Sequence, residues 1–282
     1  MGDLHESVLS DEELETFHEQ GYVRLGHVAP DQEIEALCER IDDIMLGRIR
    51  YEHMRLQLFE EDGQVRRTTG NEVATLAYRR IDDLEQDPLF LAYIQHPLFH
   101  QIVRSYIGEE VSVFRSMFMN KPPELRNSLS WHQDVGIGWG IDQNPTTTVW
   151  TALDEATMAT GCMQIVPGSN QHGIINERHF LREGEEAQYA PAEAVIELEA
   201  EAGEAILLHN FLLHCSGSNS TSSARRAFSV TYMDAEVRTL DTRQTFSKVF
   251  GVGALNPATV GDKPAELIER FDLPGVQRAN AR

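Results

Sequence analysis

The sequence predicts a mainly β domain, a sandwich or a barrel, that follows a helix-rich N-terminal part. From about residue 110 onward, short strand-like stretches are separated by clusters of Gly, Pro, Asn and Ser, which is typical of antiparallel strands joined by turns. Before that point, apolar residues recur with helical spacing behind helix-capping residues. A parallel α/β sheet would alternate strands and helices throughout the chain, and this sequence does not.

The N-terminal part predicts three helices and one strand. Residues 10–21 form the first helix, because Ser10 is followed three positions later by a glutamate in a capping box. Residues 22–25 alternate like a strand. Residues 30–45 begin with proline and keep their apolar side chains on one helical face, and residues 88–107 do the same.

The middle and C-terminal parts predict strands joined by loops. Residues 48–71 are charged and aperiodic, so we expect a surface loop there, or a lid over a pocket. The predicted strands are residues 110–119, 146–153, 163–166, 194–198, 205–208 and 227–233. No linker or repeat divides the 282 residues, so we expect one domain with a helix-rich part (1–108), a β core (109–236) and a C-terminal extension (237–282).

Composition excludes several classes of function. The formal net charge is −21, whereas nucleic-acid binding requires clustered basic residues, so we expect no nucleic-acid partner. No apolar run is long enough to cross a bilayer, and the acidic N-terminus does not resemble a signal peptide. Three widely spaced cysteines argue against a disulfide framework and favour a reducing compartment, with the cytoplasm as the default.

The pair His132 and Asp134 is the strongest chemical signal. Strand side chains alternate, so residues two apart project from the same face. Together with a second imidazole, they would form the two-His-one-carboxylate triad of non-haem Fe(II) sites, which leaves coordination positions open. Among the eleven histidines, only His132 is followed two residues later by an acidic residue. A surface His–Asp hydrogen bond is the alternative.

The second imidazole is sought in the apolar segment 205–217. His214 ends this run before a turn and is the candidate, but His209 competes with it. Five residues apart on one regular strand, the two would face opposite sides. Periodicity does not choose between them.

Arg225 and Arg226 open the last core strand and have opposite parity. A buried guanidinium requires an anion, and its planar fork fits a carboxylate in a bidentate manner. Beside a metal, that anion could be a cosubstrate carboxylate. The alternative is an ion pair with one of the 45 acidic residues of the chain.

Five blocks of sequence together resemble the phytanoyl-CoA dioxygenase family of Fe(II)- and 2-oxoglutarate-dependent oxygenases. The resemblance runs in order from about residue 12 to residue 232 and is strongest across 117–232, whereas 48–75 and the tail beyond about 236 match nothing in it. The blocks are Lys-Pro-Pro at 121–123, Trp-His-Gln-Asp at 131–134, Trp-Thr-Ala-Leu at 150–153, Gly-Cys-Met-Gln-Ile-Val-Pro-Gly-Ser at 161–169, and Leu-His-Cys-Ser-Gly-Ser-Asn at 213–219 followed by Arg225.

The resemblance implies a double-stranded β-helix, or cupin-like jelly roll, and assigns roles to residues. The metal ligands fall on His132, Asp134 and His214, and not on His209. Arg225 falls on the partner of the 2-oxoglutarate carboxylate. The other implied cosubstrate contacts are Ser216, Trp150, Met117 and, across a gap in the match, Arg80. The chain departs from the family at Asn170, where many members have histidine, and this departure concerns substrate fit.

The resemblance also implies the reaction. Fe(II), 2-oxoglutarate and O2 would hydroxylate an unactivated C–H bond and release succinate and CO2. A carboxylate at Asp134 favours hydroxylation, because related halogenases carry a small residue there. The rival readings are a metal-binding cupin-like protein without turnover and a non-oxidative metal-dependent isomerase or hydrolase.

The substrate is predicted to be a small organic molecule. An acyl-CoA is the alternative within the family, but its phosphates would require a basic patch, and Arg66-Arg67 is expected to be a solvated pair. Residues 135–144 and 48–75 are the candidate pocket wall, with Trp139 as a substrate platform or as packing for its loop.

Overall fold

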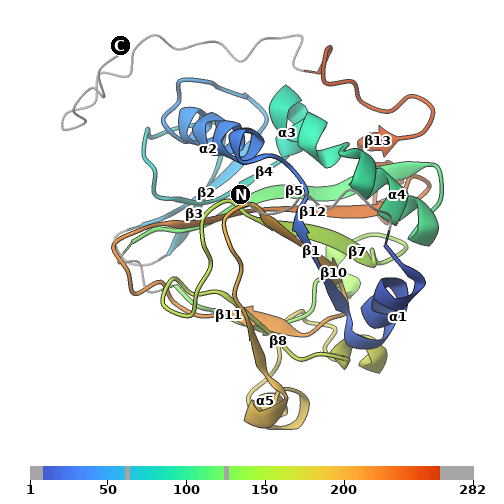
Figure 1. Cartoon of the computed structure of the whole chain (residues 1–282). Helices are drawn as coiled ribbons and strands as arrows, with labels where there is room; N and C mark the ends of the chain where they lie inside the picture. The colour runs from blue at the N-terminus through green and yellow to red at the C-terminus, as the bar shows by residue number, and fades with distance from the viewer. Residues whose placement is uncertain (1–8, 61–63, 124–126, 261–282) are drawn as a thin grey trace.

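The computed structural model describes residues 9–60, 64–123 and 127–260, and within them two antiparallel sheets face each other. The larger sheet has the order β1-β10-β7-β12-β5-β4-β2-β3, with β13 also paired to β5, and the smaller has the order β6-β11-β8-β9. Figure 1 shows the two sheets as separate layers, with α2, α3 and α4 above the larger one. This arrangement is the predicted jelly roll with flanking helices.

The strands have the following bounds: β1 Tyr22–His27, β2 Arg55–Phe59, β3 Val65–Thr69, β4 Tyr78–Asp82, β5 Val111–Lys121, β6 Leu129–His132, β7 Thr147–Ala152, β8 Met163–Ile165, β9 Ile196–Leu198, β10 Glu204–His209, β11 His214–Ser216, β12 Arg225–Asp234 and β13 Lys248–Phe250. The helices are α1 Asp11–Gln20, α2 Asp31–Met45, α3 Pro88–Ile94, α4 Pro97–Tyr106 and α5 Glu185–Tyr189.

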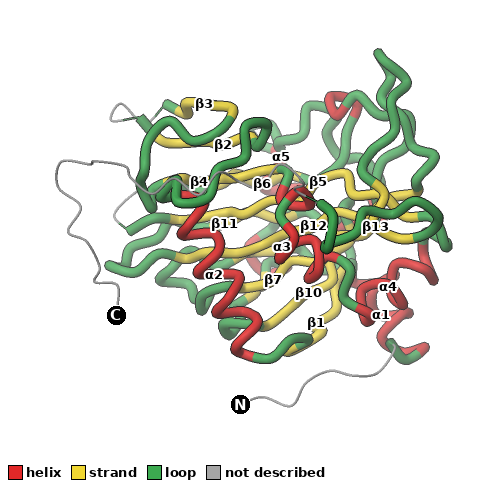
Figure 2. Tube along the Cα trace, turned by 90° about the horizontal axis from the view of Figure 1, so that it is seen from above, coloured by secondary structure: helices red, strands yellow, loops and turns green. Residues whose placement is uncertain are grey.

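The first helices form where the sequence predicts them. Ser10 and Glu13 make the predicted capping box at α1, and Gly21 ends that helix in the left-handed conformation. The single helix predicted over 88–107 is instead two, because Pro97 starts a new helix as its first residue. Figure 2 shows α2 and α3 lying across the strands of the larger sheet.

The larger sheet is buried on both faces. Val149 and Phe228 belong to the core beneath the helices, whereas their neighbours Trp150 and Ala227 belong to the core between the two sheets. All six residues of β7 are therefore buried, and this strand reads as a continuous run in the sequence. Each fully buried large apolar side chain stabilises the fold by about 1.5–3 kcal/mol.

Residues 48–71, expected to be a loop or a lid, contain the hairpin β2–β3, which extends the larger sheet beyond β4. The segment reads as polar because one face of the hairpin lines a cavity rather than the core. The C-terminal extension also returns to this sheet, since β13 pairs with β5. Strands from all three predicted parts share one sheet, and the boundaries at 108 and 236 stay a prediction. Residues 261–282 of the predicted extension lie outside the described chain.

Candidate metal centre and its pocket

Three side chains of the smaller sheet and the loop that follows it converge on one point. His132 ends β6, and His214 begins β11 directly opposite it in the antiparallel register. Asp134 follows two residues after His132, and its backbone N–H donates to the carbonyl of Asn210 at 2.8 Å. One ligand atom from each of the three residues lies within 4.8 Å of the others.

The hydrogen bonds of the two imidazoles prepare both for metal binding. His132 Nδ1 lies 2.8 Å from the Ser130 carbonyl oxygen, and His214 Nδ1 lies 2.9 Å from that of Leu212. A carbonyl oxygen only accepts, so each Nδ1 carries the proton and each Nε2 keeps its lone pair. The two Nε2 atoms lie 4.0 and 3.8 Å from the oxygens of Asp134. Backbone partners of this kind orient the rings of metal-ligating histidines.

The protonation states also suit a divalent metal. Burial, reinforced by neighbouring His214, lowers the pKa of His132 to about 3, so the ring is neutral. Burial alone would raise the pKa of Asp134, but the adjacent His214 and His132 hold it below its usual range. Two imidazole nitrogens and one ionised oxygen form the donor set that non-haem Fe(II) sites use.

His209 does not join this cluster. It ends β10, its Nδ1 accepts a hydrogen bond from the Phe211 N–H at 3.1 Å, and its ring packs 5.6 Å from that of Phe17. The structure thus separates the two histidines that periodicity alone left unresolved.

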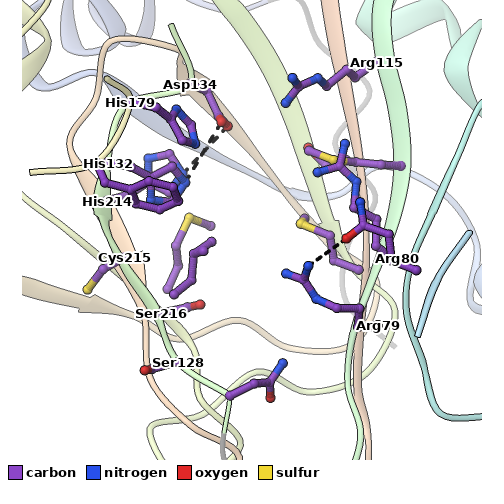
Figure 3. Close-up of a pocket in the computed structure, with 18 of the residues that line it drawn as sticks. Arg79, Arg80, Arg115, Ser128, His132, Asp134, His179, His214, Cys215 and Ser216 are labelled. Carbon is purple, nitrogen blue, oxygen red and sulfur yellow. Dashed lines mark hydrogen bonds and ion pairs between the residues drawn. The ribbon is translucent and has the colours of Figure 1, made fainter. Parts of the chain in front are cut away.

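The remaining predicted site residues line one cavity of about 1010 Å³ beside the triad. Met117, Trp150, Ser216, Arg80 and Arg225 all contribute to its wall. Figure 3 shows the triad on one side of this space and Arg79, Arg80 and Arg115 on the other. The small sheet therefore supplies the candidate ligands, and the large sheet supplies the facing wall.

Arg225 is buried in the cavity wall without an acidic partner among the described residues. It is 5% exposed, its Nη2 donates to the Gly161 carbonyl at 2.6 Å, and its Nε has no hydrogen-bond partner. Burial lowers its pKa to about 10. A buried guanidinium with an unpaired N–H group is suited to bind an anionic ligand.

Arg226 faces the opposite side of the sheet. It donates to Asp154 at 2.8 Å and to Asp42 of α2 at 3.0 Å. Arg226 therefore forms the ion pairs with acidic residues that were the alternative role for this pair of arginines.

Arg80 lines the cavity but already has an anionic partner. Its Nε lies 2.9 Å from both oxygens of Asp82, and its Nη2 forms a further contact of 2.5 Å. A cosubstrate carboxylate would have to share this guanidinium with Asp82.

The sequence analysis missed Lys121, Arg115, Arg79 and His179 as cavity residues. Lys121 is 6% exposed and stands opposite Arg225 on the neighbouring strand, and burial with the adjacent Arg225 charge lowers its pKa to about 7. A signal for two of them existed, since Arg115 and Lys121 share strand parity with Met117. The two arginines Arg66 and Arg67, expected to be a solvated pair, have different surroundings. Arg66 forms ion pairs with Glu60 and Glu72 at the surface, whereas Arg67 lines the cavity.

The chain matches the family model of phytanoyl-CoA dioxygenase (PhyH) over residues 17–227. A probable phytanoyl-CoA dioxygenase of Caenorhabditis elegans is 25% identical over 82% of this chain and 77% of that protein. The phytanoyl-CoA dioxygenase of Arabidopsis thaliana is 24% identical over 81% and 90%. The peroxisomal enzyme of Homo sapiens is 21% identical over 86% and 73%.

Solved structures share the fold. The 2-oxoglutarate-dependent carbocyclase SnoK from nogalamycin biosynthesis superimposes with a TM-score of 0.62 at 23% identity, covering 82% of this chain and 86% of that one. The apo form of EctD from S. alaskensis superimposes with a TM-score of 0.64 at 19% identity, covering 86% and 84%. The epimerase SnoN, whose structure contains Fe3+ and 2-oxoglutarate, has a TM-score of 0.59 at 18% identity over 81% and 85%.

Proposed function

The chain belongs to the phytanoyl-CoA dioxygenase family, and we propose that it hydroxylates a C–H bond of a small organic molecule, releasing succinate and CO2. It is a 2-oxoglutarate-dependent oxygenase and uses Fe(II), 2-oxoglutarate and O2, as the family does. The identity of the substrate and the hydroxylation itself are the proposal. The observation that supports it is the convergence of three donor atoms within 4.8 Å, beside a buried arginine that has no acidic partner among the described residues.

His132, Asp134 and His214 would hold the metal. Bound Fe(II) supplies the redox chemistry that couples decarboxylation of the 2-oxo acid to oxidation of the substrate. The protein's own contribution begins with two imidazoles locked by the carbonyls of Ser130 and Leu212, which keep both Nε2 lone pairs directed at one point. A carboxylate at Asp134 supports hydroxylation, because the family resemblance aligns it with a position where related halogenases carry a small residue.

Arg225 would bind the distal carboxylate of 2-oxoglutarate through its free N–H. Its other contact, to the Gly161 carbonyl, fixes the guanidinium against rotation. Lys121, directly across the strand pair, adds a second positive charge once a carboxylate is present. Ser216 contributes a hydroxyl and Trp150 an apolar wall, and both line the same cavity.

The experiment is an anaerobic titration of the protein with Fe(II) and 2-oxoglutarate, monitored by the visible metal-to-ligand charge-transfer band. We expect the band in the wild-type protein, its loss in His214→Ala, and its retention in the matched control His209→Ala. Arg225→Lys keeps the charge but loses the planar fork, so the 2-oxoglutarate Kd should rise. A band that survives in His214→Ala, or none in the wild type, would contradict the assignment.

A substrate screen for succinate release then distinguishes the candidate reactions. Curated relatives named phytanoyl-CoA dioxygenases keep acyl-CoA hydroxylation as the second candidate. Turnover without O2 or 2-oxoglutarate would favour a non-oxidative metal enzyme. The cytoplasmic location stays a prediction, since the human relative is named peroxisomal. Among the described residues, no helix has the length and apolar character to cross a bilayer.

A further inference from the structure

The cavity wall is basic in a strongly acidic protein. Its described lining contains seven Arg or Lys residues and two acidic residues, whereas the whole chain has 24 basic and 45 acidic residues. Both acidic residues are accounted for: Asp134 belongs to the triad, and Glu177 is exposed beside Arg178. With Arg225 and Lys121 assigned to the cosubstrate and Arg80 paired with Asp82, the wall still carries Arg67, Arg79 and Arg115 without an acidic partner among the described residues.

Arg115 is a cation of the cavity wall that is held by aromatic rings. It lies on β5, half-buried, with its guanidinium carbon 3.7 Å from the ring centroid of Trp139 and 4.9 Å from that of Phe114. No described residue forms a hydrogen bond or an ion pair with it. Burial and the neighbouring Arg80 charge lower its pKa to about 10, so it remains charged at neutral pH. Stacking has positioned the side chain while its N–H groups remain available.

A chain of ring contacts places Arg115 close to the candidate metal ligands. Trp139 lies 5.5 Å from His179 between centroids, and His179 lies 4.8 Å from His132. In Figure 3 Arg115 extends from the larger sheet toward the side of the cavity that carries Asp134. A group bound to Arg115 would therefore sit within the cavity beside the triad rather than at the molecular surface.

We propose that Arg115, stacked on Trp139, binds an anionic group of the substrate, and that the substrate is therefore an organic carboxylate or phosphate. The inference rests on the proposed function. A charge balance supports it: Fe(II), Asp134 and the dianion 2-oxoglutarate sum to −1, which Arg225 offsets. Arg80 is paired with Asp82, so the wall keeps a positive surplus, to which Arg115 contributes together with Lys121, Arg67 and Arg79.

The neighbouring wall adds to the attraction. The register between β2 and β4 shifts so that Arg79 has no partner residue, and this bulge lets two consecutive arginines line the cavity. Arg79 donates to the neutral Gln57 at 2.7 Å and stacks on Phe59 at 5.2 Å, so its charge is not neutralised either. A positive concave surface concentrates anions that the acidic exterior repels.

The test compares matched probes that differ in charge: pentanoate against pentanamide, and butyl phosphate against butan-1-ol. Affinity is measured by calorimetry on the anaerobic protein saturated with Fe(II) and 2-oxoglutarate, so that Arg225 is blocked. The same titrations on metal-free Arg225→Gln protein give a second readout that needs no cosubstrate.

We expect at least one charged probe to bind the wild type about 30-fold more tightly than its neutral match, as for a charge-assisted bidentate pair. Whether pentanoate or butyl phosphate gains more identifies the anion class. In Arg115→Gln the ratio should fall to about 3 or less, with an intermediate value in Trp139→Leu, which removes the platform. Arg104→Gln removes one charge from an exposed ion pair with Glu109 and should keep the wild-type ratio.

Equal binding of charged and neutral probes to the wild type would overturn the proposal, as would an unchanged ratio in Arg115→Gln. A tenfold rise of the 2-oxoglutarate Kd in Arg115→Gln would overturn it as well, by assigning this arginine to the cosubstrate. Failure of the proposed function is a separate result: the charge-transfer band would be absent, while the metal-free titrations would still measure the charge preference.

Discussion

Replacing Gly161 with alanine should weaken 2-oxoglutarate binding although Gly161 is neither a metal ligand nor a proposed cosubstrate contact. Its carbonyl accepts the hydrogen bond from Arg225 Nη2, and its φ is +80°. A Cβ at this position would lie 2.5 Å from the carbonyl oxygen and 2.9 Å from the carbonyl carbon of Gly217. These are backbone atoms next to Ser216, so relief of the clash must move the segment that lines the cosubstrate pocket.

The magnitude has two parts. A non-glycine residue in the left-handed region costs about 1–2 kcal/mol, and overpacking against backbone typically adds about 1–3 kcal/mol. We therefore expect the free energy of unfolding to fall by about 2–5 kcal/mol. If the Arg225 guanidinium loses its anchor, one charge-assisted hydrogen bond is misplaced, and the Kd of 2-oxoglutarate should rise about tenfold or more.

Gly184→Ala is the matched control. Gly184 has a φ of +87° and no heavy atom within 4 Å of the added Cβ, so its replacement incurs the backbone cost alone. Urea unfolding of both variants and anaerobic 2-oxoglutarate titration separate the two effects. If Gly161→Ala loses no more stability than Gly184→Ala and keeps the wild-type Kd, the anchoring of Arg225 by Gly161 is wrong.

Three further predictions concern the triad and two buried cations. Asp134→Gly should reduce Fe(II) affinity and succinate release by more than about 100-fold, because even outer-sphere partners cost about 10–100-fold; metal titration and turnover check this, and retained hydroxylation would remove Asp134 from the ligand set. The pKa of Lys121 is about 7 in the folded state and about 10.4 in the unfolded chain, so the unfolded chain binds more protons between these pH values and the free energy of unfolding rises with pH there. Lys121→Met removes this dependence, so its effect on the free energy of unfolding should be more favourable at pH 6 than at pH 9 by about 2–3 kcal/mol in urea unfolding. Equal effects at the two pH values would contradict the lowered pKa. The pKa of His209 is about 4 in the folded state and about 6.5 in the unfolded chain, so the free energy of unfolding falls as the pH drops from about 6.5 to about 4. His209→Gln should reduce this fall by up to about 3 kcal/mol. An unchanged dependence of the free energy of unfolding on pH would show that another group is responsible.

Local sequence patterns predicted most of the strands of the β core. Strand parity identified Arg225 and Arg226 as opposites, and the structure places one in the cavity and the other against Asp42 and Asp154. Which of them faced inward was not decided by parity, because both faces of the larger sheet are covered. That choice, like the choice of His214 over His209, came from the resemblance. The ligand roles themselves stay a prediction.

The hairpin β2–β3 could not be found from hydrophobic periodicity. Its cavity face carries Gln57 and Arg67, which are paired directly across the two strands. On the other face of β2, Leu56 is buried in the core and Leu58 packs against it, whereas β3 has no buried apolar residue. Two alternating leucines are too short a pattern to predict a strand, and β3 has no apolar alternation at all. Strand parity with Met117 could have indicated that Arg115 faces the cavity. Its stacking on Trp139 could not be predicted, because Trp139 lies on a loop after the next strand and no local spacing encodes that contact.

The two sheets divide the chemistry between them. The smaller sheet and the loop after β6 present two imidazole nitrogens and one carboxylate, whereas the facing wall of the larger sheet presents guanidinium and ammonium groups. Like charges on this wall destabilise the fold, because Arg225 and Lys121 are buried side by side and no acidic residue of the described chain pairs with them. Binding of an anion between the sheets relieves that destabilisation. Anions should therefore stabilise the fold by more than their contacts alone, and the proposed preference for charged substrates would arise from the same wall.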